Sequence, residues 1–362
     1  MIPVSKVALS EAEKTAVMRV LDSGLLAQGK EVEELERQFR GATSSPNAVA
    51  FSNGTSALHG ALHCLGIKPG DEVITVPFTF IATPNSIRMC GAKPVFVDVG
   101  DDFLMNPALV EQAITSKTKA ILPVHLYGQP CDMDALRSIA ERHKLVIVED
   151  AAQAIGAAYR KKPVGSLGDA AAFSLYATKN IMSGEGGMVT TPRADVADWC
   201  RRFRSHGQRN RYEYSELGYN YRMTDMQAAI GVEQIKRLAE ITEARQTNAR
   251  ALLKGLAGIK GILLPSVHEG RTHVFHQFTI RVTPDFHLSR DALQQKLLEQ
   301  GIGTGVYYPQ ALHLSPAFRE LGYHTGDFPV SERLSREVLS LPCHPHLTSA
   351  EIQTIIEAFH HV

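Results

Sequence analysis

Two reactive side chains, an acid and an amine, follow apolar runs in the middle of the sequence. Asp150 ends the run 146–150, and Lys179 comes shortly after the run 170–173 and before the glycines at 184–187. Apolar, β-branched runs are typical of buried parallel strands, and the carboxyl ends of such strands carry the sites of open α/β sheets. A lysine on a tight loop leaving a buried strand is partly desolvated, which lowers its pKa and makes a neutral, nucleophilic amine available.

Each of these residues also has a purely structural interpretation. A lone lysine is most often a solvated surface charge, and an acid after an apolar strand often only caps a helix. Their order favours chemistry, because a pyridoxal phosphate enzyme needs an amine for a Schiff base and a carboxylate that keeps the pyridine nitrogen protonated. The sequence therefore predicts a pyridoxal phosphate site at Asp150 and Lys179.

A polar turn, Ser-Asn-Gly-Thr-Ser at 52–56, lies between an apolar run at 48–51 and a helical pattern that begins at 57. Such a turn at a helix N-terminus presents backbone N–H groups and hydroxyls to an anion such as phosphate. Ser, Thr and Asn are also ordinary helix caps that bind nothing else. The turn matches neither the Walker pattern nor G-x-G-x-x-G, so nucleoside triphosphate or dinucleotide binding of those kinds is not expected.

Together these segments resemble the DegT/DnrJ/EryC1/StrS family of pyridoxal phosphate-dependent nucleotide-sugar aminotransferases. The resemblance is carried by E-D-A-A-Q at 149–153, F-S-L-Y-A-T-K-N at 173–180 and S-N-G-T at 52–55, and it extends over nearly the whole chain. It implies an α/β fold of the aspartate-aminotransferase-like type, the type I fold of pyridoxal phosphate enzymes. Residues 1–240 are expected to form a large domain with a mostly parallel mixed sheet flanked by helices, and residues 241–362 a smaller α+β C-terminal domain.

The resemblance also implies a role for each candidate site residue. Lys179 is expected to hold the cofactor and to move protons, Asp150 to pair with the pyridine nitrogen, Gln153 to reach the phenolic oxygen, and Phe80 to stack on the ring. The phosphate is expected to be held by donors from two protomers: Gly54, Thr55, Ser56 and Ser174 from one, and Asn220 from the other.

A long polar, aromatic and basic passage covers residues 204–223. A solvated loop would explain its composition, but loops of this length inside a compact domain are often functional. Its end, G-Y-N-Y-R at 218–222, resembles the family's G-x-N-Y-R pattern, in which the Asn contacts the cofactor phosphate of the partner. The resemblance therefore implies a homodimer in which Asn220 reaches across to the second site.

The C-terminal part contains one further segment that resembles the family. Y-P-Q-A-L-H at 308–313 is similar to a family segment near the sugar site, so Tyr308 and His313 are candidate substrate residues, although either could simply pack. Two structural expectations concern the same part of the chain. The pattern from 224 toward 256 predicts one long helix between the domains, and 305–308 is expected to form a short strand.

Composition excludes several classes of protein. Lys and Arg together number 38, as do Asp and Glu, so there is no basic stripe that would suit nucleic acid. The five cysteines include no C-x-x-C pair and indicate reduced thiols. No signal peptide and no run long enough to span a bilayer is visible. We therefore expect a soluble, cytoplasmic protein with no nucleic acid partner, no membrane partner and no metal site.

The predicted function is amino transfer. The resemblance implies that an amino acid, most often L-glutamate in this family, donates its amino group to the cofactor, and that pyridoxamine phosphate then aminates a keto-sugar nucleotide in a ping-pong pair of half-reactions. The product would enter amino sugar biosynthesis for a surface polysaccharide or a glycosylated metabolite. Two alternatives are a related sugar dehydratase, which has histidine in place of the lysine, and a non-catalytic regulator that binds sugar nucleotide.

Overall fold

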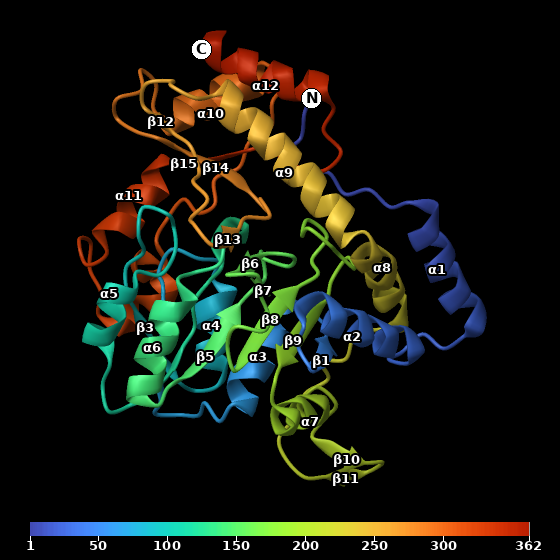
Figure 1. The fold of residues 1–362 in the computed structure, drawn as a ribbon. Helices are drawn as coiled ribbons and strands as arrows, with labels where there is room; N and C mark the ends of the chain where they lie inside the picture. The colour runs from blue at the N-terminus through green and yellow to red at the C-terminus, as the bar shows by residue number, and fades with distance from the viewer. Residues whose placement is uncertain (362) are drawn as a thin grey trace.

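A seven-stranded mixed sheet forms the centre of the molecule in a computed structural model that describes residues 1–361 (Figure 1). Val362, the last residue of the expected C-terminal domain, lies outside the described residues. The strand order is β1-β9-β8-β5-β4-β2-β3. In this sheet, β9 (Gly187–Thr191) runs antiparallel to both its neighbours, β1 (Asn47–Phe51) and β8 (Ala170–Ser174). The other strands pair in parallel: β5 (Val146–Asp150), β4 (Thr118–Ile121), β2 (Glu72–Thr75) and β3 (Lys93–Phe96).

Helices cover both faces of the sheet, which explains why most residues of its parallel strands are apolar and buried. Neighbouring residues of β5 show the two faces, because side chains alternate along a strand. Ile147 packs in a core with α2 (Lys30–Thr43) and α6 (Met133–His143). Val148 packs in a second core, whose helices are α3 (Gly54–Cys64), α4 (Ala82–Met89) and α7 (Ala194–Phe203). The predicted α/β architecture with a mostly parallel mixed sheet is confirmed.

The strand register brings the predicted site segments to one edge of the sheet. Phe51 of β1 pairs with Gly187, and Gly187 pairs in turn with Ser174 at the end of β8. On the other side of β8, Asp150 at the end of β5 pairs with Ala172. The start of α3, the end of β8 and the end of β5 therefore lie next to one another although the sequence separates them widely.

The C-terminal part forms a separate hydrophobic core (Figure 1). Its three-stranded antiparallel sheet has the order β12-β14-β15, and helices pack around it. Ile2 belongs to this core and pairs with Ile302, so the start of the chain lies with the C-terminal part. The division at residues 240 and 241 remains a prediction. The elements of this part are α9 (Leu238–Gly255), β12 (Ile262–Leu263), β14 (Phe278–Val282), α10 (Arg290–Glu299), α11 (Pro329–Glu337), β15 (Val338–Leu341) and α12 (Ser349–His361).

Two local expectations were wrong. The single helix expected from 224 is divided into α8 (Asp225–Lys236) and α9, because Arg237 leaves the helical conformation at φ −99° and ψ 7°. The break lets α8 pack against α1 (Glu11–Ser23) and α2 while α9 packs against α12. Residues 305–308 form no strand: Gly305 makes one bridge to Ser340, and Tyr307 and Tyr308 turn instead toward a cavity.

Three properties concern residues 1–361 as a whole. None of the helices there has the length and apolar character that crossing a membrane requires. The described residues also contain no group of three His, Cys, Asp or Glu side chains arranged to hold a metal ion. All the cysteines are buried free thiols, as expected of core residues: Cys64, Cys90, Cys131, Cys200 and Cys343.

Helix α2 is capped by a side chain from a distant helix. Gly29 at its N-terminus has no side chain to cap it, and the carboxylate of Asp225, the first residue of α8, takes this role. Asp225 accepts hydrogen bonds from the backbone N–H groups of Gly29 (2.7 Å), Val32 (3.1 Å) and Glu31 (3.3 Å) and is only 5% exposed. The cap fixes α2 against α8.

We expect Asp225→Ala to lower the free energy of unfolding by about 2 kcal/mol, because it leaves buried N–H groups without an acceptor. Urea denaturation followed by circular dichroism measures the change. Asp22→Ala, which removes an exposed acid in α1, is the control and should change stability by less than about 0.5 kcal/mol. Equal stability of the two variants would contradict the proposed cap.

Candidate active site

A cavity of about 680 Å³ opens at the edge of the sheet where these segments meet. Its volume lies in the range of sites for cofactors and small molecules. Nine of the predicted site residues line it: Gly54, Thr55, Ser56, Phe80, Asp150, Gln153, Ser174, Lys179 and Tyr308. They come from the loops after β1, β2, β5 and β8 and from the C-terminal part.

Lys179 supplies the amine of this cavity. Its backbone N–H donates to the carbonyl of Tyr176 (2.8 Å), which closes the tight turn after β8 that the sequence predicts. Burial lowers the pKa of the Lys179 amine to about 8, and the Asp150 carboxylate opposes this shift. A substantial fraction of the amine is therefore neutral near physiological pH, as a nucleophile or a base requires.

Asp150 supplies the carboxylate and is only 4% exposed. Burial raises the pKa of its carboxyl group, whereas a hydrogen bond from the Thr83 hydroxyl, the N–H of Ala152 and the charge of Lys179 oppose the rise. The Thr83 hydroxyl donates to Oδ2 (2.7 Å) and the Ala152 N–H to Oδ1 (3.2 Å). Such donors favour the ionised form, which a protonated ring nitrogen needs as its partner.

The Thr83 hydroxyl is itself positioned by the Thr79 hydroxyl at 2.9 Å. Both threonines are buried; Thr83 lies in the first turn of α4, and Thr79 lies in the loop before it. Neither threonine was predicted from the sequence, because two threonines four residues apart carry no signal that one of them contacts a distant acid.

The start of α3 forms an anion cradle. Asn53 caps this helix by accepting from the Ser56 N–H (2.8 Å), and the first N–H groups of a helix, here those of Gly54 and Thr55, have no intrahelical acceptor. The loop also lies very close to β8, since a Cβ atom on Gly54 would meet the Cβ of Ser174 at 2.9 Å. Only glycine permits this approach. These donors suit a phosphate group.

The side chain of Gln153 is held by two tyrosines. Its Oε1 accepts from the backbone N–H of Tyr127 (2.7 Å), and its Nε2 donates to the hydroxyl of Tyr308 (3.3 Å). An amide nitrogen has two donors, so one remains for a ligand. The rings of Phe80 and Tyr308 lie 6.1 Å apart, and Phe80 is 56% exposed, which leaves a flat apolar face open toward the cavity.

Two histidines lie close to the site. His276, which the sequence analysis missed, lines the cavity, and its Nδ1 lies 3.2 Å from Oδ1 of Asn180. Burial, together with the charges of Lys179 and Arg245, lowers the pKa of His276, so it is neutral. His125 is fully buried and uses both ring nitrogens: Nδ1 accepts from the Cys131 N–H (3.1 Å) and Nε2 donates to Glu149 (3.0 Å).

Two predicted residues do not line the cavity of their own chain. Asn220 is exposed, next to Tyr221, which does line it. Asn220 follows the hairpin of β10 (Gln208–Asn210) and β11 (Glu213–Tyr214), which projects away from the sheet (Figure 1). His313 is buried, its Nε2 lies 3.1 Å from Glu332, and its ring packs on Phe328. Its surroundings are those of a packing residue, which was the alternative left open from the sequence.

The amine, the buried carboxylate, the anion cradle and the flat apolar face fit pyridoxal phosphate. The amine and the carboxylate line the same cavity, the cradle offers donors to the phosphate, and Phe80 offers a surface to the ring. The sequence reasoning found each of these groups. The residues that were not predicted are Thr79, Thr83 and Tyr127, which orient Asp150 and Gln153, and His276, which lines the cavity.

Comparison with known proteins agrees with this geometry. A "Pleiotropic regulatory protein" from Geobacillus stearothermophilus is 46% identical over 96% of this chain and 94% of its own length. A dTDP-3-amino-3,4,6-trideoxy-alpha-D-glucose transaminase from Streptomyces venezuelae is 43% identical over 95% of this chain and 90% of its own length. The crystal structure of S. venezuelae DesV in complex with a ketimine intermediate superposes with a TM-score of 0.94, at 40% identity, covering 99% of this chain and 98% of DesV.

A match to one protein family covers residues 7–360, almost the whole chain. The similar proteins span nearly their full lengths in these alignments, so the likeness is not confined to one domain. The chain therefore belongs to the DegT/DnrJ/EryC1/StrS aminotransferase family.

Proposed function

We propose that the protein transfers an amino group from an amino acid, L-glutamate, to a keto-sugar nucleotide, with pyridoxal 5′-phosphate as the cofactor. The observation that carries this proposal is that a buried carboxylate and an amine of lowered pKa line one cavity beside an anion cradle. Family membership and the likeness to a nucleotide-sugar transaminase support it independently. We also propose that the protein is a homodimer and that it acts in the cytoplasm.

The cofactor, when bound, supplies an aldehyde that takes up an amine and a ring that withdraws electrons. Lys179 supplies the amine that holds it, and the same amine, when free, accepts and returns the proton at the carbon that bears the amino group. Asp150 keeps the ring nitrogen protonated, Gln153 donates to the phenolic oxygen, and Phe80 covers the ring.

We assign the remaining contacts in the same way. The phosphate is held by the cradle of Gly54, Thr55 and Ser56, by Ser174, and by Asn220 of the second protomer. The exposed position of Asn220, together with the projecting hairpin before it, supports a residue that serves a neighbouring copy rather than its own chain. Tyr308, which lines the cavity beside Phe80, is the better placed of the two candidate substrate residues.

A regulator without catalysis is the second candidate, and the name of the Geobacillus relative favours it. Such a protein would bind the cofactor and leave glutamate unconverted. The lowered pKa of Lys179 supports catalysis, because a binding protein has no need of a partly neutral amine. The dehydratase has less support, since Lys179 stands where those relatives have histidine.

Replacing Lys179 tests the proposed base. We expect Lys179→Ala and Lys179→Arg to slow amino transfer from glutamate to the cofactor by at least about 100-fold, the usual contribution of a general base. Stopped-flow absorbance of the cofactor, added to both variants, measures this half-reaction. Lys161→Ala, which removes an exposed loop lysine, is the control and should react at the wild-type rate. Wild-type turnover by the Lys179 variants would disprove the assignment.

Thr83→Val tests whether the threonine hydroxyl keeps Asp150 ionised. Without this donor the pKa of Asp150 rises further, so the ion pair with the ring nitrogen is lost at a higher pH on acidification. We expect the affinity for the cofactor at neutral pH to fall about tenfold. We also expect the loss of affinity on acidification to begin at a higher pH than in the wild type. Fluorescence titration of the apoprotein between pH 5 and pH 8 measures both. Thr79→Val should change the cofactor affinity less, because the Thr79 hydroxyl contacts Asp150 only through the Thr83 hydroxyl.

Mixing two inactive variants tests the shared site. If Asn220 serves the partner's cofactor, a heterodimer of Lys179→Ala and Asn220→Ala has one intact site and one site with both defects. After random exchange about a quarter of the wild-type activity should return, because half the dimers are mixed and each has one working site. A different affinity tag on each variant allows the mixed dimers to be isolated, which verifies that the subunits have exchanged. Complete exchange without recovery would show that Asn220 acts within its own chain.

A further inference from the structure

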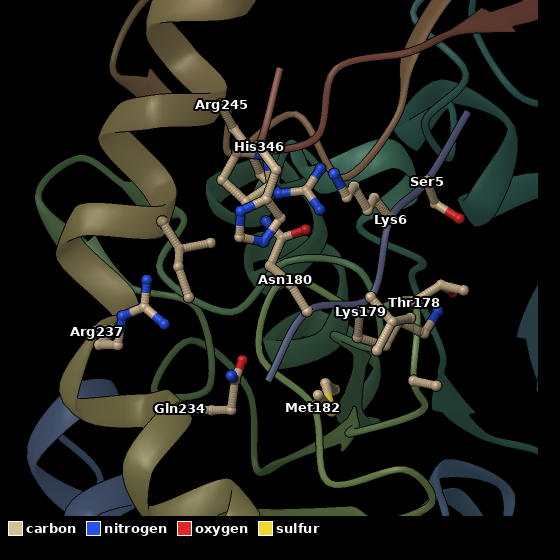
Figure 2. A pocket seen from close by; sticks show the side chains of 15 residues that line it. Ser5, Lys6, Thr178, Lys179, Asn180, Met182, Gln234, Arg237, Arg245 and His346 are labelled. Carbon is tan, nitrogen blue, oxygen red and sulfur yellow. The ribbon is translucent and has the colours of Figure 1, made fainter. Parts of the chain in front are cut away.

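A second, much smaller cavity, of about 40 Å³, lies next to the active-site cavity, and Ser5, Thr178 and Lys179 line both. Four parts of the chain enclose it: the N-terminal segment, the Lys179 turn, the junction of α8 with α9, and the segment at 345–346 (Figure 2). We call it the basic cavity, after the side chains of Lys6, Arg237, Arg245 and His346 that line it.

Positive charge surrounds the basic cavity without an equal amount of negative charge. None of its lining residues, all of which the structure describes, is an acid. Of the four basic side chains named above, Arg237 forms ion pairs with acids: Glu240 lies at 2.8 Å and Glu13 at 3.9 Å from its guanidinium. Within residues 1–361, neither Lys6 nor Arg245 forms an ion pair with an acid.

Arg245 is the clearest example of a cation without a counter-charge, because its side chain is only 6% exposed. Its Nη1 donates to the backbone carbonyls of Phe275 (3.1 Å), His276 (3.4 Å) and Cys343 (3.5 Å), and its Nε has no acceptor. Burial lowers the pKa of this guanidinium to about 10, which still leaves it charged at neutral pH. Buried charges are normally paired, so Arg245 lacks a counter-charge.

Two neighbouring histidines respond to the same excess of positive charge. Burial, followed by the charges of Arg245 and His346, lowers the pKa of His344 to about 4. Burial, followed by Lys6, Arg237 and Arg245, lowers the pKa of His346, with Glu240 in opposition. Both ring nitrogens of His344 also lack a hydrogen-bond partner. Neither histidine therefore adds charge at neutral pH, and neither supplies the missing anion.

We propose that the basic cavity binds one small inorganic monoanion of the size of chloride, held by Arg245 and Lys6. A single water needs roughly 10–15 Å³ of such space, so a cavity of about 40 Å³ holds a halide but not a sugar nucleotide. The anion supplies the counter-charge of Arg245 and accepts charge-assisted hydrogen bonds. Because the Lys179 turn lines the cavity, the bound anion also stabilises the wall that it shares with the active site.

Bromide tests the proposal, since it replaces chloride and scatters anomalously. Crystals of the full-length protein grown in sodium bromide should show an anomalous peak within hydrogen-bond distance of Arg245 and Lys6. In solution, bromide should raise the Tm in proportion to the logarithm of its concentration once that concentration exceeds the Kd, and sodium gluconate at equal ionic strength should not reproduce this rise. An anomalous map without a peak in the basic cavity, or equal responses to the two salts, would overturn the proposal.

Lys6→Met tests the residue assignment without disturbing the fold, because Lys6 is exposed and makes no ion pair. Loss of one cationic partner should raise the Kd for bromide, fitted from the dependence of the Tm on bromide concentration, by about tenfold. Lys14→Met is the matched control, since it removes an exposed lysine of α1 that lies outside the basic cavity. An unchanged bromide response in Lys6→Met would remove Lys6 from the site and contradict the proposal.

Discussion

The placing of an acid and an amine in a poorly solvated site at one edge of the sheet is the constraint on which the rest of this structure depends. Burial disfavours the charged form of each group, and each opposes that effect on the other. The backbone of Asp150 is fixed on both sides, because its N–H donates to the carbonyl of Pro123 and its carbonyl accepts from the His125 N–H. The Thr83 hydroxyl then fixes the side chain. Because both the backbone and the side chain of Asp150 are held by hydrogen bonds, its carboxylate keeps its position when a ligand enters.

The same edge requires the backbone segments of three strands to approach closely. Phe51, Gly187 and Ser174 lie in one row across the sheet, and a Cβ atom on Gly187 would stand 2.2 Å from the carbonyl oxygen of Asn53. Glycine at 187 and at 54 therefore brings the start of α3 against the end of β8. The anion cradle follows from strand register as much as from the polar residues of the loop itself.

Local patterns in the sequence predicted the parts of the structure that depend on local physics. Apolar β-branched runs marked the strands, and the acid and the lysine that follow two of them reached one cavity. The residues that were missed meet their partners only through the fold: Thr83 reaches Asp150 from the first turn of α4, and the backbone N–H of Tyr127 holds Gln153.

The errors have the same origin. Tyr307 and Tyr308 alternate like a strand, but they face the cavity and do not extend the small sheet, and one residue, Arg237, divides a helix whose apolar spacing continues across it. For His313 the sequence left packing open beside a role in the sugar site, and its buried contact with Glu332 agrees with packing. None of these three outcomes is encoded within a few residues, because each depends on which distant element occupies the neighbouring space.

The pairing of Ile2 with the segment at 301–303 has a consequence for the order in which the molecule is completed. The N–H of Ile2 donates to Gly301 and its carbonyl accepts from Gly303, so the beginning of the chain finds its place only after the ribosome has released a late part of it. Ser5, a few residues further on, forms part of the wall of both cavities. A nascent polypeptide that already contains Asp150 and Lys179, but not yet the segment at 301–303, therefore still lacks one wall of its pocket.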